Sequence, residues 1–194
     1  MEDCRFNVSI TPLKDLVNVL VVIEYIGNNQ DIINKLSPSR LLVKVLLGVY
    51  KDETVLKDFY NYSLVTKYAR KLKGAAHACL CVAICLALTS KHITPSTQIT
   101  LNASGTLQGR EDEDMSGLVE YYRELGFRGE YTQQELDRRW VKMHSVVSDV
   151  LDICKTKEIS EELQAIIPQI CNDFVCPLEN VKPSKINPTK LNFL

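Results

Sequence analysis

The longest apolar run of the chain, Gly74 to Leu88 (GAAHACLCVAICLAL), limits the possible folds more than any other feature. The run is shorter than the roughly 20 residues that cross a bilayer, and it contains His77. We therefore predict a core helix that continues to about Thr89, since Pro95 forbids a further continuation. A thiol in such a run behaves as a small apolar side chain. Three cysteines share this setting: Cys79, Cys81 and Cys85.

Length and charge favour one globular domain. The chain has 194 residues, 45% hydrophobic and 24% charged, which suits a real core with an added tail. A net charge of −1 gives no overall attraction to nucleic acid or anionic lipid. The N-terminus lacks a cleavable apolar region, and seven cysteines, an odd number, favour reduced thiols over a disulfide framework. We expect an intracellular, cytoplasmic protein with no metal site.

The residues before the apolar run mix strand and helix signals. Phe6 to Ile10 is typical of a short strand, and Pro12 is expected to open a helix that ends before Gly27. The segment 31–36 allows one or two helical turns. Arg40 to Tyr50 is predicted to be a buried strand with a hairpin partner over Thr54 to Phe59. A further strand over 60–69 fits the pattern, although the leucines and lysines here also permit helix.

The residues after the run give clearer signals. Gln98 to Ser104 alternates between apolar and polar residues and is predicted to be a strand. A helix follows the acidic loop 105–114, with Ser116 as a cap. It ends in GLVEYYRELGF (117–127), where Gly126 suits a left-handed residue and Phe127 can fold back on the last turn.

The C-terminal third has helical spacing. Apolar residues over 133–154 predict one long amphipathic helix, although 139–144 also allows a strand beside a short one at 128–131. A second helix is expected over 160–174, interrupted at Pro168, and the residues from Pro177 onward form an extended tail. The predicted organisation is a core over 1–131, helices packed on it over 132–176, and a tail over 177–194.

Two short motifs resemble the GCN5-related N-acetyltransferases, abbreviated GNAT. KLKGAA (71–76) is similar to the family's pyrophosphate loop, and YRELGF (122–127) is similar to its Tyr-x-x-x-Gly-Phe helix ending. The motifs occur in the family's order with one strand between them, and the resemblance covers residues 60–127. It implies an α/β fold with a mixed, splayed β-sheet flanked by helices, here with a helical C-terminal extension.

The resemblance also implies a site. A free helix N-terminus preceded by small residues binds anions, so the loop is expected to hold the diphosphate of acetyl-CoA. The residues assigned to that loop are Arg70, Lys71, Lys73, Gly74, Ala75 and Ala76. Tyr122 takes the position that protonates the departing CoA thiolate, and a phenol is a suitable acid for a thiolate of pKa near ~8.5. Backbone N–H groups near 64–69 would polarise the thioester carbonyl. Glu53 and Asp58 are candidate general bases.

Each assignment has a structural alternative. The loop can be a basic turn before a core helix, and Tyr122 can be a core aromatic residue. The expected function is acetyl transfer from acetyl-CoA, as cosubstrate, to a primary amine by direct attack on the thioester. The alternative is a non-catalytic interaction protein, either an inactive GNAT-like fold or a mainly helical bundle. We expect the protein to bind its amine substrate, and we expect no binding to nucleic acid or membrane. The sequence allows a homodimer.

Overall fold

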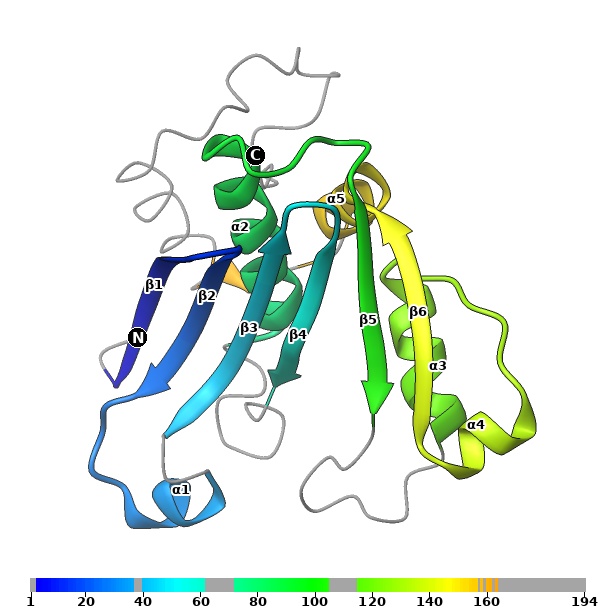
Figure 1. The fold of residues 1–194 in the computed structure, drawn as a ribbon. Helices are drawn as coiled ribbons and strands as arrows, with labels where there is room; N and C mark the ends of the chain where they lie inside the picture. Colours follow the sequence, from blue (N-terminus) through cyan, green and yellow to red (C-terminus); the bar gives the residue numbers. More distant parts are fainter. Residues whose placement is uncertain are drawn as a thin grey trace.

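The fold is mixed α/β, with a six-stranded mixed sheet flanked by helices (Figure 1). The computed structural model describes residues 3–36, 40–61, 72–104 and 115–156, and also 158, 160, 161 and 163. The strands are β1 (Cys4–Leu13), β2 (Leu16–Tyr25), β3 (Leu41–Tyr50), β4 (Thr54–Asn61), β5 (Gln98–Ser104) and β6 (Trp140–Val146). The helices are α1 (Gln30–Lys35), α2 (Ala75–Thr89), α3 (Met115–Glu124), α4 (Gln133–Asp137) and α5 (Val147–Thr156).

The strands lie in the sheet in chain order, β1-β2-β3-β4-β5-β6. Neighbouring strands are antiparallel except β4 and β5, which are parallel. A parallel pair requires a crossover connection, and α2 lies within the one between these strands. Two hairpins therefore form the larger part of the sheet, with four strands, and β5 and β6 form the rest.

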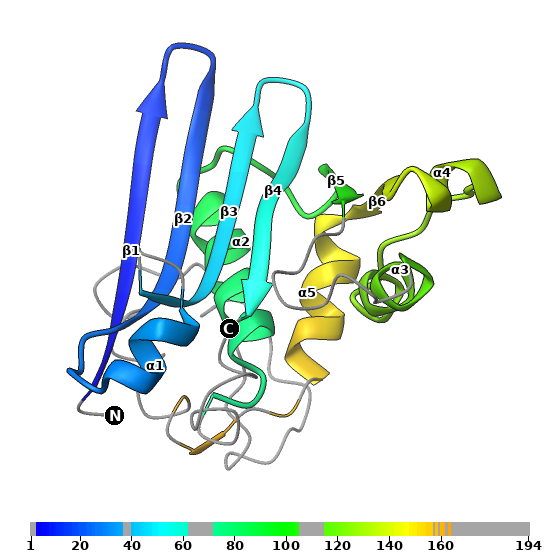
Figure 2. The same cartoon turned by 90° about the horizontal axis from the view of Figure 1, so that it is seen from below.

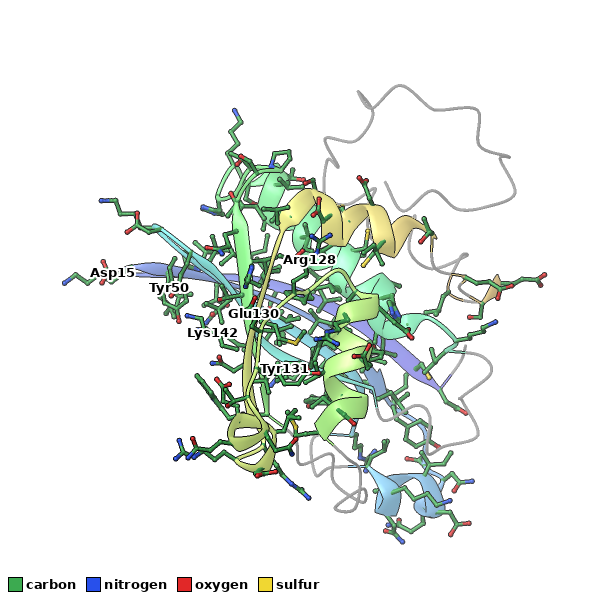
Figure 3. The ribbon with its side chains drawn as sticks, turned by 90° about the vertical axis from the view of Figure 1, so that its right-hand side faces the viewer. Asp15, Tyr50, Arg128, Glu130, Tyr131 and Lys142 are labelled. Carbon is green, nitrogen blue, oxygen red and sulfur yellow. The ribbon has the colours of Figure 1, made fainter. Side chains whose placement is uncertain are left out.

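The helices α2, α3 and α5 cover one face of the sheet (Figure 2). Figure 3 shows the sheet from its β6 edge, and there Tyr50 and Lys142 lie on the side away from these helices. The covered face carries alternate β-branched and leucine side chains, among them Val19, Val21 and Val45, which are fully buried. Helix α2 packs against β2, β3 and α5, so it is apolar on nearly every side and has twelve buried residues.

Most of the predicted elements are confirmed. The structure has the expected strands at β3, β4 and β5, the short helix α1, the core helix α2, and α3 before Gly126. The alternative of a mainly helical bundle is wrong, because residues 41–61 form a β-hairpin. The predicted strand over 60–69 extends past the described residues after Asn61, and the helix around Pro168 and the tail lie outside them.

The helix predicted to open at Pro12 is wrong. Pro12 lies in β1, Lys14 and Asp15 form a two-residue turn, and the chain returns as β2. Half of the ten residues of β2 are valine or isoleucine, and β-branched side chains favour a pleated strand over a helix. The turn at Lys14 and Asp15 lacks the glycine or asparagine that marks most two-residue hairpins, so the sequence did not indicate it.

The continuous helix predicted over 133–154 is also wrong. The capping box of Thr132 and Glu135 starts a helix, α4, that ends at Asp137. Arg139 then adopts a left-handed conformation with φ of 53°, and β6 begins at Trp140. In β6, Val141, Met143 and Ser145 are buried and the residues between them are exposed, as in a strand with one covered face. The segment therefore contributes a strand to the sheet before helix α5 begins.

Candidate functional site

The two central strands separate along their length. β4 pairs with β5 from Thr54 to Leu56, yet β4 continues to Asn61 and β5 to Ser104. The strands lie side by side at their N-terminal ends and diverge toward their C-terminal ends (Figure 1). The β3–β4 register shifts opposite Lys57, immediately after the paired residues. Such a bulge bends and twists a strand, which accounts for the departure of β4 from β5.

The N-terminus of α2 follows this divergent end of β4. Gly74 precedes the helix in a left-handed conformation, with φ of 76°, and has no side chain to cap the first turn. Its carbonyl accepts the first helical bond from the N–H of Ala78 at 2.9 Å. Ala75 and Ala76 are buried against the core, so they present only backbone toward this end of the helix. The first turn contains no acidic residue, which leaves the positive end of the helix dipole uncompensated there.

Lys73 beside this turn forms an ion pair. Its Nζ lies 2.5 Å from Oε2 of Glu158, and its carbonyl accepts a bond from the N–H of Ser160 at 3.1 Å. Both side chains are largely exposed, so the pair contributes little to stability. The pair matters for the site because the ammonium group of Lys73, next to the helix N-terminus, is already bound to a carboxylate, that of Glu158.

Five rings connect β4, α2 and α3. This aromatic cluster consists of Phe59, His77, Tyr121, Tyr122 and Phe127. Tyr121 is at its centre, with ring centroids 5.9 Å from Phe59, 5.9 Å from His77 and 5.7 Å from Tyr122. Phe59 lies on the part of β4 that has left β5, and His77 lies in the first turn of α2. The cluster therefore joins the divergent strand, the helix N-terminus and the Tyr-Tyr pair.

The end of α3 explains one part of the Tyr-Tyr motif. Phe127 N–H donates to the carbonyl of Tyr122 at 3.1 Å, and Gly126 N–H donates to that of Arg123 at 2.9 Å. With Gly126 at φ of 87°, these bonds form a Schellman motif. The rings of Phe127 and Tyr122 contact each other edge to face, with centroids 6.3 Å apart, which is the apolar contact that accompanies this motif. The predicted left-handed glycine and the return of Phe127 are confirmed.

Both phenols are held in their neutral form. Burial raises the pKa of Tyr122 to about 12. Burial, followed by the neighbouring Tyr122, Cys154 and Glu124, raises the pKa of Tyr121 well above its usual value. Tyr122 is 8% exposed. A phenol in this setting can donate a hydrogen bond or a proton throughout the neutral range, and it does not act as a phenolate base.

The two carboxylates considered as bases occupy different places. Glu53 lies in the β3–β4 turn, where its carbonyl accepts a bond from Tyr50 N–H, at the end where β4 and β5 are paired. Asp58 lies on the divergent part of β4, with Oδ2 2.6 Å from Nζ of Lys44. Asp58 is therefore the carboxylate of the two that belongs to the divergent end.

Most of the predicted site residues that lie within the described part of the chain are close to one another in the fold. Lys73, Gly74, Ala75 and Ala76 are consecutive at the start of α2, and two ring contacts connect His77 of this turn to Tyr122. Arg70, Lys71 and the predicted carbonyl-polarising segment 64–69 lie outside the described residues.

Sequence reasoning missed the roles of Phe59, His77 and Glu158. No local pattern marks Glu158, because its contact with Lys73 spans 85 positions of the chain. The sequence indicates Phe59 only as part of a strand and His77 only as part of a core helix, because their ring contacts form only when β4, α2 and α3 are assembled.

The remaining chemistry of the described residues is limited. Of the cysteines that the structure describes, Cys79, Cys81, Cys85 and Cys154 are buried, and Cys4 is partly exposed. Over the described ranges, no three His, Cys, Asp or Glu side chains form a group that could hold a metal ion. None of the helices in this part of the chain combines the length and apolar composition that a membrane span requires.

Comparison with known proteins gave no family model, curated protein or solved structure that matches this chain.

The Schellman motif makes a direct stability prediction. Gly126→Ala is expected to lower the free energy of unfolding by about 1–2 kcal/mol, because an L-residue is strained in the left-handed conformation. An added Cβ would also lie 2.7 Å from Cδ1 of Ile153. Chemical denaturation measures the change. Gly117→Ala in the same helix is the control, since its Cβ would meet nothing within 4 Å, and it should stabilise by roughly 0.5–1 kcal/mol. Equal effects of the two substitutions would contradict the motif.

Proposed function

We propose that this protein is an acetyl-CoA-dependent N-acetyltransferase with a GNAT-like fold, acting on a primary amine. The observation that carries the proposal is the parallel pair β4–β5, which separates after three residue pairs beside the N-terminus of α2. Separated parallel strands expose backbone N–H and C=O groups on both sides of the opening, and an extended ligand can pair with them. The adjoining helix N-terminus suits the anionic end of such a ligand.

Each part of acetyl-CoA would have a counterpart in the site. The diphosphate would accept bonds from first-turn N–H groups of α2 other than that of Ala75, which already donates to the carbonyl of Leu72 at 3.0 Å. The left-handed Gly74 would let the diphosphate approach the backbone closely. The pantetheine arm would lie between the divergent strands and bring the thioester toward the aromatic cluster. Backbone N–H groups of β4 beyond Leu56 would polarise the thioester carbonyl.

The reaction would be a direct transfer. The amine attacks the thioester carbonyl, the C–N bond forms, and the C–S bond breaks to release CoA thiolate. Asp58 would receive the proton that the amine loses, directly or through water, and Tyr122 would supply the proton that the thiolate gains. The pKa of about 12 keeps Tyr122 protonated until that step.

A second function rests on one specific observation. Tyr122 is 8% exposed, and both its carbonyl and its ring serve the end of α3. A GNAT-like fold without catalysis would keep the tyrosine for this purpose alone. Such a protein would act by binding a partner, and it would lack acetyl transfer whether or not CoA binds.

Binding of CoA tests the first step of the proposal. Wild-type protein should bind CoA and gain thermal stability by mass action. Gly74→Asp should weaken binding at least ~10-fold relative to Gly74→Asn, because the two side chains have the same shape and both tolerate the left-handed conformation, so they differ in charge alone. Isothermal titration calorimetry gives both affinities. Equal affinities of the two variants would place the diphosphate elsewhere, and wild-type protein without affinity for CoA would refute the acetyltransferase proposal.

A further inference from the structure

The strand β1 lies at one edge of the sheet formed by the described residues. Of the strands that the structure describes, β1 is the last on its side and pairs with β2 alone (Figure 1). A strand in this position carries backbone donors and acceptors that can pair with another chain. Proteins usually protect such edges with charges or with very short strands, yet β1 has ten residues and a single charged one, Arg5.

The hydrogen-bond register fixes which backbone groups of β1 point outward. Residues of an antiparallel pair alternate between those bonded to each other and those whose N–H and C=O point away. Ile26 N–H donates to the carbonyl of Asp3 at 2.8 Å, and Leu13 and Leu16 flank the two-residue turn. The odd residues of β1 are thus bonded to β2. Tyr25, opposite an even residue, agrees with this, since its N–H donates to Arg40 on the β3 side at 2.9 Å.

The even residues therefore direct their N–H and C=O groups away from β2. Among them are Phe6, Val8 and Ile10. Pro12 has the same orientation, so its missing N–H removes no bond to β2, which explains how a proline fits in this strand. The outer edge of β1 offers a regular set of donors and acceptors from Phe6 to Ile10.

The side chains at these positions are apolar and incompletely buried. Phe6, Val8 and Ile10 lie opposite Ile23, Val21 and Val19, which are at most 1% exposed. The three β1 residues pack against the same core and stay partly exposed. The edge thus combines backbone groups that point outward with an apolar row on the helix-bearing face.

We propose that β1 is a homodimer interface, in which two copies pair antiparallel about a two-fold axis at Val8. The two six-stranded sheets then join into one. Val8 lies opposite Val8 of the second copy, and Phe6 lies opposite Ile10 on both sides of the axis. The outward N–H and C=O groups of each of these residues meet their complements, as an isologous interface requires.

The rest of the strand fits the same register. On the opposite face, Asn7 meets Ser9 and Arg5 meets Thr11 of the second copy, so no like charges face each other. Three large hydrophobic residues among those described are exposed, and two of them lie near the ends of β1. Leu13, its last residue, is 53% exposed, and Ile26, which bonds to Asp3, is 42% exposed. The axis brings Leu13 opposite Asp3 of the second copy, whose neighbour on the next strand is Ile26. This self-complementarity favours a second copy over an unrelated peptide.

Sedimentation velocity and register-specific crosslinking test the interface. Wild-type protein should sediment with twice the mass of the chain at high concentration. In a Cys4→Ser background, Val8→Cys should give a disulfide-linked dimer on mild oxidation, because a bonded antiparallel pair places its Cα atoms about 5.5 Å apart. Ile10→Cys is the matched control. It should stay unlinked, since its partner is Phe6.

A third variant removes the pairing itself. Val8→Pro deletes an N–H that points away from β2, so the fold should persist, as circular dichroism would report, while the dimer is lost. A wild-type monomer at every concentration would overturn the proposal. So would a dimer that survives Val8→Pro, or one in which Ile10→Cys links and Val8→Cys does not.

Discussion

Phe127→Ala is expected to lower the free energy of unfolding by about 3–5 kcal/mol, the largest stability effect that we predict. The ring is fully buried and lies edge to face on Tyr122. Its removal leaves a cavity and takes away the apolar contact that closes the end of α3. Urea denaturation, followed by circular dichroism, measures the loss.

A conservative substitution separates the effect of losing the aromatic ring from the effect of losing side-chain volume. Phe127→Leu fills most of the space and should cost less than about 1.5 kcal/mol, while the bond from the residue 127 N–H to Tyr122 persists. If the alanine variant lost less than about 1 kcal/mol, the cavity argument for this site would fail. Because the effect arises in packing alone, it holds under both the catalytic and the non-catalytic function.

The sequence predicted an element well where one signal decided its structure. The apolar run of α2 is long and uninterrupted, and α2 was found where it was expected. Gly126 was predicted correctly because glycine is almost the only residue that adopts the left-handed conformation freely. The sequence of β5 alternates between apolar and polar residues, so its period could be read directly.

The prediction failed where two periods competed. Valines at 17, 19 and 21 fit a strand, but Leu16, Leu20 and Val22 beside them also allow a helical face. Pairing with β1 and β3 decided for the strand, and that information lies in distant residues. Trp140 to Val146 alternate as a strand does, but the residues on either side have helical spacing, so the sequence favoured a helix. Pairing with β5 makes the segment a strand. The local sequence did not contain these pairings.

In the candidate site, too, the local motifs could be predicted from the sequence and the contacts between distant residues could not. The loop before α2 and the Tyr-Tyr motif were visible as short patterns, and they supplied Gly74 and Tyr122. The contacts between them were not visible, since Phe59, His77 and Tyr121 come from three elements that meet only in the assembled fold. The separation of β4 from β5 depends on a bulge opposite β3, and no residue type marks it in the sequence.

Tyr122→Phe is expected to reduce the rate of acetyl transfer about 10²-fold while folding and CoA binding remain at wild-type level. The Schellman motif uses the carbonyl and the ring of residue 122, and phenylalanine keeps both. The substitution removes only the hydroxyl, which in the proposed reaction protonates the departing thiolate. Tyr121→Phe is the matched control, with the same chemical change at the neighbouring position, and it should leave the rate nearly unchanged.

The pH dependence of the wild-type rate provides a second measurement on the same residue. An acid acts in its protonated form, so activity that depends on it is lost as pH rises through its pKa. Because burial raises the pKa of Tyr122 to about 12, this group should cause no loss of rate near pH ~10, where an ordinary phenol ionises. An alkaline loss near that value that disappears in Tyr122→Phe would show a phenol exposed to solvent in the working enzyme. An unchanged rate in Tyr122→Phe, with transfer intact in wild type, would assign the proton to another group and leave Tyr122 with its structural role at the end of α3.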